Sequence, residues 1–162
     1  VLIFLAGSVA GYIYEELFCL IFDHEIVNRG FLYGPYLPVY GFGSVLMVFL
    51  LKRFKKNPLV VFLLAMLVTG VLEYFTGYAL WEIFHKTWWD YTGLFLNIDG
   101  YVCLRSVLTF GIGGILLIYI VEPLVSMFVS RFAKYKIYIL SYCVCCVVAL
   151  DFILTLIFRN KF

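Results

Sequence analysis

Five ionisable side chains within or beside strongly apolar segments are the residues of this sequence that could do chemistry. Two are carboxylates, Glu15 and Glu73, two are guanidinium groups, Arg29 and Arg105, and the fifth is Asp90. A charge inside an apolar helix needs a partner, a wet cavity or a function. Glu15 lies roughly 10 Å below the end of its helix. We expect the two acids and two arginines to form one buried polar cluster, with Asp90 on the same side.

Three roles for this cluster remain open. It could be a structural ion-pair network that fixes the register of the helices. It could be a polar pocket, open to the outside, that holds a small solute or an ion. Two isolated carboxylates could also relay protons, because desolvation raises their pKa values.

Several catalytic and metal-binding motifs do not occur in the sequence. It contains no phosphate-binding glycine loop that ends in Lys-Ser or Lys-Thr, no His-Glu-x-x-His and no serine in a nucleophile elbow. Cys143, Cys145 and Cys146 are too tightly spaced along one helix to surround a metal ion. We therefore expect no cofactor and no metal, and the sequence favours a role other than an enzyme. The net charge of +2 gives no reason to expect a nucleic-acid partner.

Composition indicates that lipid is the solvent around these charges. Of the 162 residues, 65% are hydrophobic and 14% are charged, whereas soluble domains are about half apolar and a quarter charged. The apolar residues form blocks of helical length. We predict an all-α fold, a polytopic transmembrane bundle of about five helices in a single domain over residues 1–162. The expected helices are residues 1–22, 36–51, 58–84, 102–121 and 137–158.

Small residues share helix faces with the two buried acids. The first helix carries Gly7, Gly11 and Glu15 at intervals of four residues, and the third carries Gly70, Glu73 and Gly77 on one face. Such faces let another helix approach closely. We expect them to serve helix packing within the chain or a homo-oligomer.

Helix-breaking residues crowd the segment before the second helix. They predict a loop that dips into the membrane, where protein or a wet cavity must shield non-helical backbone. The residues assigned to this loop and to the start of the helix are Asn28, Gly30, Gly34, Pro35, Pro38, Gly41 and Gly43.

Basic residues set the expected orientation. Residues 52–56 hold four cations and residues 131–136 hold three, which places both turns in the cytoplasm and the N-terminus inside. Trp88, Trp89 and Tyr91 then form an interfacial aromatic belt on the outer side. The first block is too long and too acidic at its end for a cleaved signal peptide, and because the chain starts with Val1 we expect residues to be missing before it.

The motifs of the chain resemble those of the ABC-transporter type IV permease family, small bacterial membrane proteins common in Firmicutes. The segments that carry the resemblance are Gly11–Glu15, Asn28–Tyr36, Pro38–Gly43, Leu72–Tyr74, Trp88–Tyr91, Leu96–Asn97, Gly100 and Cys103–Leu104. Together they cover nearly the whole chain up to the fourth helix. Tyr101 departs from the pattern, since the family often has an arginine there, and Arg105 one turn deeper could supply that charge.

The resemblance implies a permease-like protein in the bacterial plasma membrane. The first hypothesis is a subunit that binds or translocates a small solute and works with a separate ATP-binding subunit. One alternative is an accessory or sensor subunit whose buried charges serve assembly. Another is a membrane enzyme that acts on a lipid-linked substrate, with Glu15, Glu73 and Asp90 as acids and bases.

Overall fold

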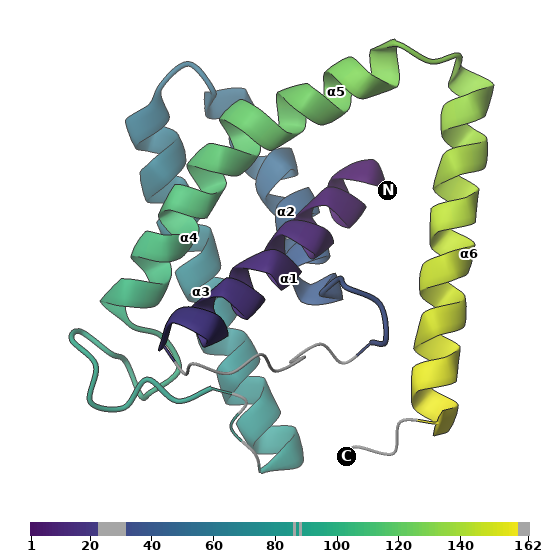
Figure 1. Ribbon diagram of the computed structural model, residues 1–162. Helices are drawn as coiled ribbons and strands as arrows, with labels where there is room; N and C mark the ends of the chain where they lie inside the picture. The colour runs from purple at the N-terminus through teal and green to yellow at the C-terminus, as the bar shows by residue number, and fades with distance from the viewer. Residues whose placement is uncertain (23–31, 86, 88, 159–162) are drawn as a thin grey trace. The chain divides into compact units, whose positions relative to one another are not determined.

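The computed structural model describes residues 1–22, 32–85, 87 and 89–158, and within them it is built from helices, with a long loop between Phe84 and Leu104 (Figure 1). This confirms the all-α prediction. The elements in chain order are α1 (Leu2–Phe22), α2 (Pro38–Leu51), the 3₁₀ turn η1 (Lys52–Phe54), α3 (Pro58–Phe84), α4 (Leu104–Leu116), the π-helical turn η2 (Leu117–Val121), α5 (Glu122–Ser130) and α6 (Lys134–Phe158).

Four of the described helical runs are long and apolar enough to cross a membrane: Leu2–Ile21, Pro58–Ile83, Leu104–Ser130 and Lys134–Phe158. Each exposes large apolar side chains, such as Ile21, Phe75, Ile112 and Phe158. Apolar surface on this scale suits a lipid environment. Helix α2 has 14 residues, so it rises about 21 Å and is shorter than a hydrocarbon core of about 30 Å. A fifth crossing at α2 therefore depends on the segment before it.

The fourth helical run is longer than the sequence predicted. Its end was expected near residue 121, but the helix continues from Leu104 to Ser130. The π-helical turn η2 ends at Val121, and Pro123 lies in the first turn of α5, where a missing amide hydrogen costs little. The Glu122 carboxylate accepts a hydrogen bond of 2.8 Å from the Ser126 hydroxyl one turn later. The fifth predicted helix, now α6, begins at Lys134 instead of residue 137.

The chain divides into two compact units. The first contains residues 1–46 and 121–162, and the second contains residues 47–120.

Small residues bring α1 and the start of α2 together in the first unit. A Cβ atom on Gly7 would lie 2.1 Å from the Ser44 hydroxyl, and one on Gly11 would lie 2.2 Å from the Tyr40 ring. On the facing side, a Cβ atom on Gly41 would meet the Ser8 hydroxyl at 2.2 Å. Gly7 and Gly11 therefore serve a contact within the chain.

Helices α3 and α4 form the packed pair of the second unit. Gly114 lies against Ala65, where a Cβ atom would approach the alanine methyl to 2.5 Å, and Gly111 lies against Phe62. Both helices begin at well-formed caps. The Asn57 side chain accepts hydrogen bonds from two amides at the start of α3, and Cys103 with Ser106 forms a reciprocal capping box at the start of α4.

Candidate functional site

Glu73 lies in the apolar α3 helix and is held by hydroxyl groups from two other elements of the second unit. The Tyr91 hydroxyl donates to Glu73 Oε1 at 2.8 Å. The Ser106 hydroxyl, in the first turn of α4, donates to Glu73 Oε2 at 2.7 Å. Both carboxylate oxygens thus have a donor, which lowers the cost of placing this group in a membrane span. We call these three residues the Glu73 site.

The Ser106 hydroxyl has a second acceptor within reach. Its oxygen is 2.9 Å from the Cys103 carbonyl oxygen as well as 2.7 Å from Glu73 Oε2. A hydroxyl has one hydrogen to donate, so Ser106 can serve either acceptor by rotation. One oxygen of the carboxylate can therefore be released without leaving the serine unsatisfied.

Burial keeps Tyr91 a neutral donor. Burial is the main cause of its raised pKa, and the charge of Glu73 and the hydrogen bond to it raise the pKa further. The Arg105 guanidinium is near enough for its charge to oppose this increase. The predicted residues Glu73, Tyr91 and Arg105 are thus brought into one region of the second unit, with Arg105 exposed at its edge.

The loop between α3 and α4 folds back beside α3 and so positions Tyr91. The Tyr101 ring packs on Gly77, where a Cβ atom would lie 2.8 Å from the ring. The Trp89 indole donates to the Tyr101 carbonyl at 2.8 Å, and the Tyr91 amide donates to the Gly100 carbonyl at 2.9 Å. Glu73 is eleven residues, or about 16 Å, from the end of α3. The fold-back is what lets a loop tyrosine reach it.

Asp90 serves the loop itself. Its exposed carboxylate accepts a 2.8 Å hydrogen bond from the Thr92 amide. Hydrogen bonding by Thr92, through its side chain and its backbone, lowers the pKa of Asp90. Gly100 has a φ of +71° and lies close to the same carboxylate, where a Cβ atom would come within 2.9 Å of it. Asp90 thus stabilises the turn over residues 90–92, which contains Tyr91.

Glu15 has a partner in the first unit. The Tyr40 hydroxyl of α2 donates to Glu15 Oε1, and the absence of a side chain on Gly11 makes room for the Tyr40 ring. Glu15 and Glu73 thus belong to different units.

The segment leading into α2 lies inside the first unit and depends on Asp151 of α6. The Leu37 amide donates to the Ser8 carbonyl at 3.0 Å, and Ser8 is fourteen residues, about 20 Å, from the Phe22 end of α1. The amides of Tyr33 and Gly34 donate to the two oxygens of Asp151 at 3.1 Å and 2.9 Å. Non-helical backbone at this depth must find its partners within the protein.

The Asp151 carboxylate has two further hydrogen-bond donors, both of them side-chain hydroxyls. It also accepts hydrogen bonds from the Tyr36 hydroxyl and, at 3.4 Å, from the Thr155 hydroxyl. The Tyr36 amide donates to the Gly34 carbonyl at 2.9 Å, and Pro35 has no amide hydrogen. Every amide hydrogen from Tyr33 to Leu37 therefore has an acceptor. By accepting two of these hydrogens, the Asp151 carboxylate has a structural role in the apolar helix α6.

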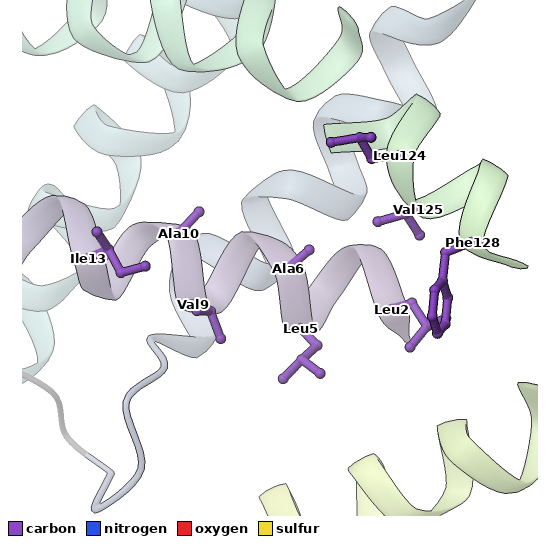
Figure 2. Close-up of a pocket in the computed structure, with 9 residues that line it drawn as sticks. All are labelled: Leu2, Leu5, Ala6, Val9, Ala10, Ile13, Leu124, Val125 and Phe128. Atoms are coloured by element: carbon purple, nitrogen blue, oxygen red, sulfur yellow. The ribbon is translucent and has the colours of Figure 1, made fainter. Parts of the chain in front are cut away.

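An apolar groove runs between α1 and α5 in the first unit and contains none of these carboxylates (Figure 2). Its walls are Leu2, Leu5, Ala6, Val9, Ala10 and Ile13 from α1, and Leu124, Val125 and Phe128 from α5. Such a surface suits a lipid chain and offers nothing to orient a polar solute.

The structure separates the predicted site residues into groups. Arg29, with Asn28, Gly30 and Trp88, lies outside the described residues. Gly70 packs on Val107, whereas Gly43 has open space around it. The cluster of two acids and two arginines therefore stays a prediction.

Sequence reasoning missed two residues of these networks. Ser106 was not selected, although a serine three residues after a helix cap is a recognisable signal. Asp151 shares its helix face with no glycine, so it lacks the local signal that marks Glu15 and Glu73. Its partner is a loop far away in the sequence, and no local pattern reveals that.

Comparison with known proteins gives one family. A family model described as "Putative ABC-transporter type IV" matches residues 2–156, nearly the whole chain. No curated protein and no solved structure matches it.

Proposed function

This chain belongs to the ABC-transporter type IV family, and we propose that it is the membrane subunit of a transporter that binds a small polar solute at the Glu73 site. Family membership and the four apolar helices make it a multi-pass membrane protein related to transport. The observation that carries the proposal is a carboxylate inside an apolar span that accepts hydrogen bonds from two hydroxyls of the described residues.

The chemistry of the site indicates the kind of solute. A carboxylate accepts hydrogen bonds and attracts positive charge, so the complementary solute carries donors or a cation. Because Ser106 can turn to the Cys103 carbonyl, a solute can take its place on Glu73 at little cost. Arg105 at the edge of the site would hold an acidic group of the same solute.

Energy comes from a separate subunit in this proposal. The sequence holds no phosphate-binding glycine loop of the kind that binds ATP. We place the protein in the bacterial plasma membrane, with the N-terminus and both basic turns in the cytoplasm, as the distribution of lysine and arginine supports. The Glu73 site then opens to the outer side.

Thermal unfolding of the purified protein with a panel of solutes tests the binding site. A ligand that binds the folded state raises the unfolding midpoint. We expect at least one amine or amino-acid-like solute to stabilise the wild type but not Glu73→Gln. Glu82→Gln is the matched control, because Glu82 lies on the same helix and is exposed. A solute that stabilises Glu73→Gln as well as the wild type would contradict the site, as would no response across the panel.

The partner is tested separately. We expect the chain to purify in a fixed ratio with an ATP-binding subunit, and the solute found above to stimulate ATP hydrolysis by that complex. A complex whose ATP hydrolysis ignores the solute would argue for the accessory role instead.

A further inference from the structure

The turn between α2 and α3 presents an unusual density of positive charge on a structured piece of backbone. Lys52, Arg53, Lys55 and Lys56 supply four cations in five residues, and residues 52–57 contain no acid. Lys52, Arg53 and Lys56 are exposed, whereas Lys55 is half-buried. All of them lie directly at the ends of two apolar helices, so they sit at the depth of lipid headgroups.

Several contacts within the second unit hold this turn in shape. Tyr119 lies in the helical run Leu104–Ser130, and its hydroxyl donates a hydrogen bond of 2.7 Å to the Lys55 carbonyl. The amides of Lys55 and Asn57 donate to the carbonyls of Lys52 and Phe54 at 3.2 Å and 3.0 Å. Leu51, next to the first cation, is almost fully buried. The cations therefore project from a fixed frame, which reduces the ordering cost of binding an anion.

An aromatic side chain belongs to the same surface. Phe54 is 37% exposed, and the Arg53 guanidinium lies over its ring, 5.0 Å from the centroid. An exposed phenylalanine among cations fits the boundary between acyl chains and headgroups, where its ring is in lipid and the charges face phosphate.

We propose that residues 52–56 bind the phosphate of an anionic phospholipid. Juxtamembrane cations attract anionic lipids, and each contributes about a fivefold gain in binding. The short turn favours a lipid over a protein partner, because six residues between helix ends cannot project far from the membrane surface. This inference does not depend on the proposed function.

Nanodiscs of defined composition test the proposal. The protein is placed in phosphatidylcholine alone or with about a quarter phosphatidylglycerol, and the unfolding midpoint and the number of retained phosphatidylglycerol molecules are measured. We expect phosphatidylglycerol to stabilise the wild type. The triple variant Lys52→Gln, Arg53→Gln, Lys56→Gln should lose this stabilisation and bind phosphatidylglycerol on the order of a hundredfold more weakly, a factor of about five for each cation.

Three controls make the result specific. The charge-preserving variant Lys52→Arg, Lys56→Arg should behave as the wild type. Neutralising Arg131, Lys134 and Lys136 removes the same number of charges from the other basic turn, and should leave most of the effect. Equal losses from both neutralised variants would mean a general charge effect and would overturn the proposal. So would an unchanged lipid response in the first variant, which would leave a protein partner as the reason for the charges, or stabilisation by inorganic phosphate in phosphatidylcholine discs.

Discussion

Replacing Asp151 with asparagine should release the segment that leads into α2. The carboxylate accepts the Tyr33 and Gly34 amides and the hydroxyls of Tyr36 and Thr155. Asparagine keeps one acceptor oxygen but replaces the second with an NH₂ group. This group is itself a donor, so it cannot accept the hydrogen bonds that the second oxygen accepted. Hydrogen bonds to a charged group contribute about 1.5–3 kcal/mol and neutral ones about 1 kcal/mol. Losing one amide bond and weakening the second should therefore cost roughly 3 kcal/mol for local opening, about a 150-fold change in the opening equilibrium.

Hydrogen exchange at residues 32–37 measures this opening directly. In nanodiscs we expect the Tyr33 and Gly34 amides to exchange roughly 150-fold faster in Asp151→Asn, with unchanged exchange in α3 and α4, since local opening and global unfolding are separate events. Thr155→Val is the matched control, because it removes only the 3.4 Å contact and leaves both amide bonds. Normal protection of these two amides in a folded Asp151→Asn protein would refute the role given to the carboxylate. A uniform increase over the whole chain would refute its local character.

Three further predictions concern the second unit. Gly114→Ala should lower the unfolding midpoint, since the new Cβ atom would lie 2.5 Å from that of Ala65. A Cβ atom on Gly113 would have nothing within 4 Å, so Gly113→Ala should leave the midpoint unchanged or raise it through better helix propensity. The reverse order of the two midpoints would contradict the α3–α4 packing. Cys103→Ala should destabilise the protein by about 1 kcal/mol in chemical unfolding, because it removes the cap of α4. Cys103→Ser should keep the stability of the wild type, because serine can also cap the helix. Equal stability of the two variants would count against the cap. Thr92 hydrogen bonds lower the pKa of Asp90, so the carboxylate stabilises its turn above about pH 4 and this contribution disappears as the pH falls through the folded-state pKa. Thr92→Val should raise the Asp90 pKa towards its ordinary value in a carboxyl-carbon NMR titration, and an unshifted titration would show that the Thr92 hydroxyl is not the cause.

Helix positions were predictable because hydrophobic length is a local property. The predicted third helix over residues 58–84 agrees with α3, whose start is marked by Asn57 and Pro58. The end of the fourth was not predictable, because a π-helical turn next to Pro123 depends on how the helix packs. The glycines at 7 and 11 indicated a close contact, but their partners Ser44 and Tyr40 follow from tertiary structure alone.

The candidate site was predictable only in so far as it depends on local sequence. Glu73 stands out in the sequence as an acid among apolar residues, so its need for partners could be stated. Tyr91 was chosen as an interfacial aromatic, yet its hydroxyl reaches Glu73 because the loop folds back over Gly77. Nothing in the sequence gives the path of that loop, since it depends on bonds such as that from Trp89 to the Tyr101 carbonyl.

Glu73 and Asp151 show that an acid in an apolar helix can have two different meanings. Both carboxylates lie where a non-helical segment enters beside a helix, and both accept hydrogen bonds from it. Asp151 accepts backbone amides, whose donors have no alternative partner at that depth, so the contact is structural and its loss exposes unsatisfied backbone. Among the described residues, the hydrogen-bond donors to Glu73 are hydroxyls, which rotate and can also accept, and one of them already has a second acceptor. The hydroxyl of Ser106 can therefore leave Glu73 without losing its own acceptor, whereas the amides held by Asp151 have no such alternative at that depth.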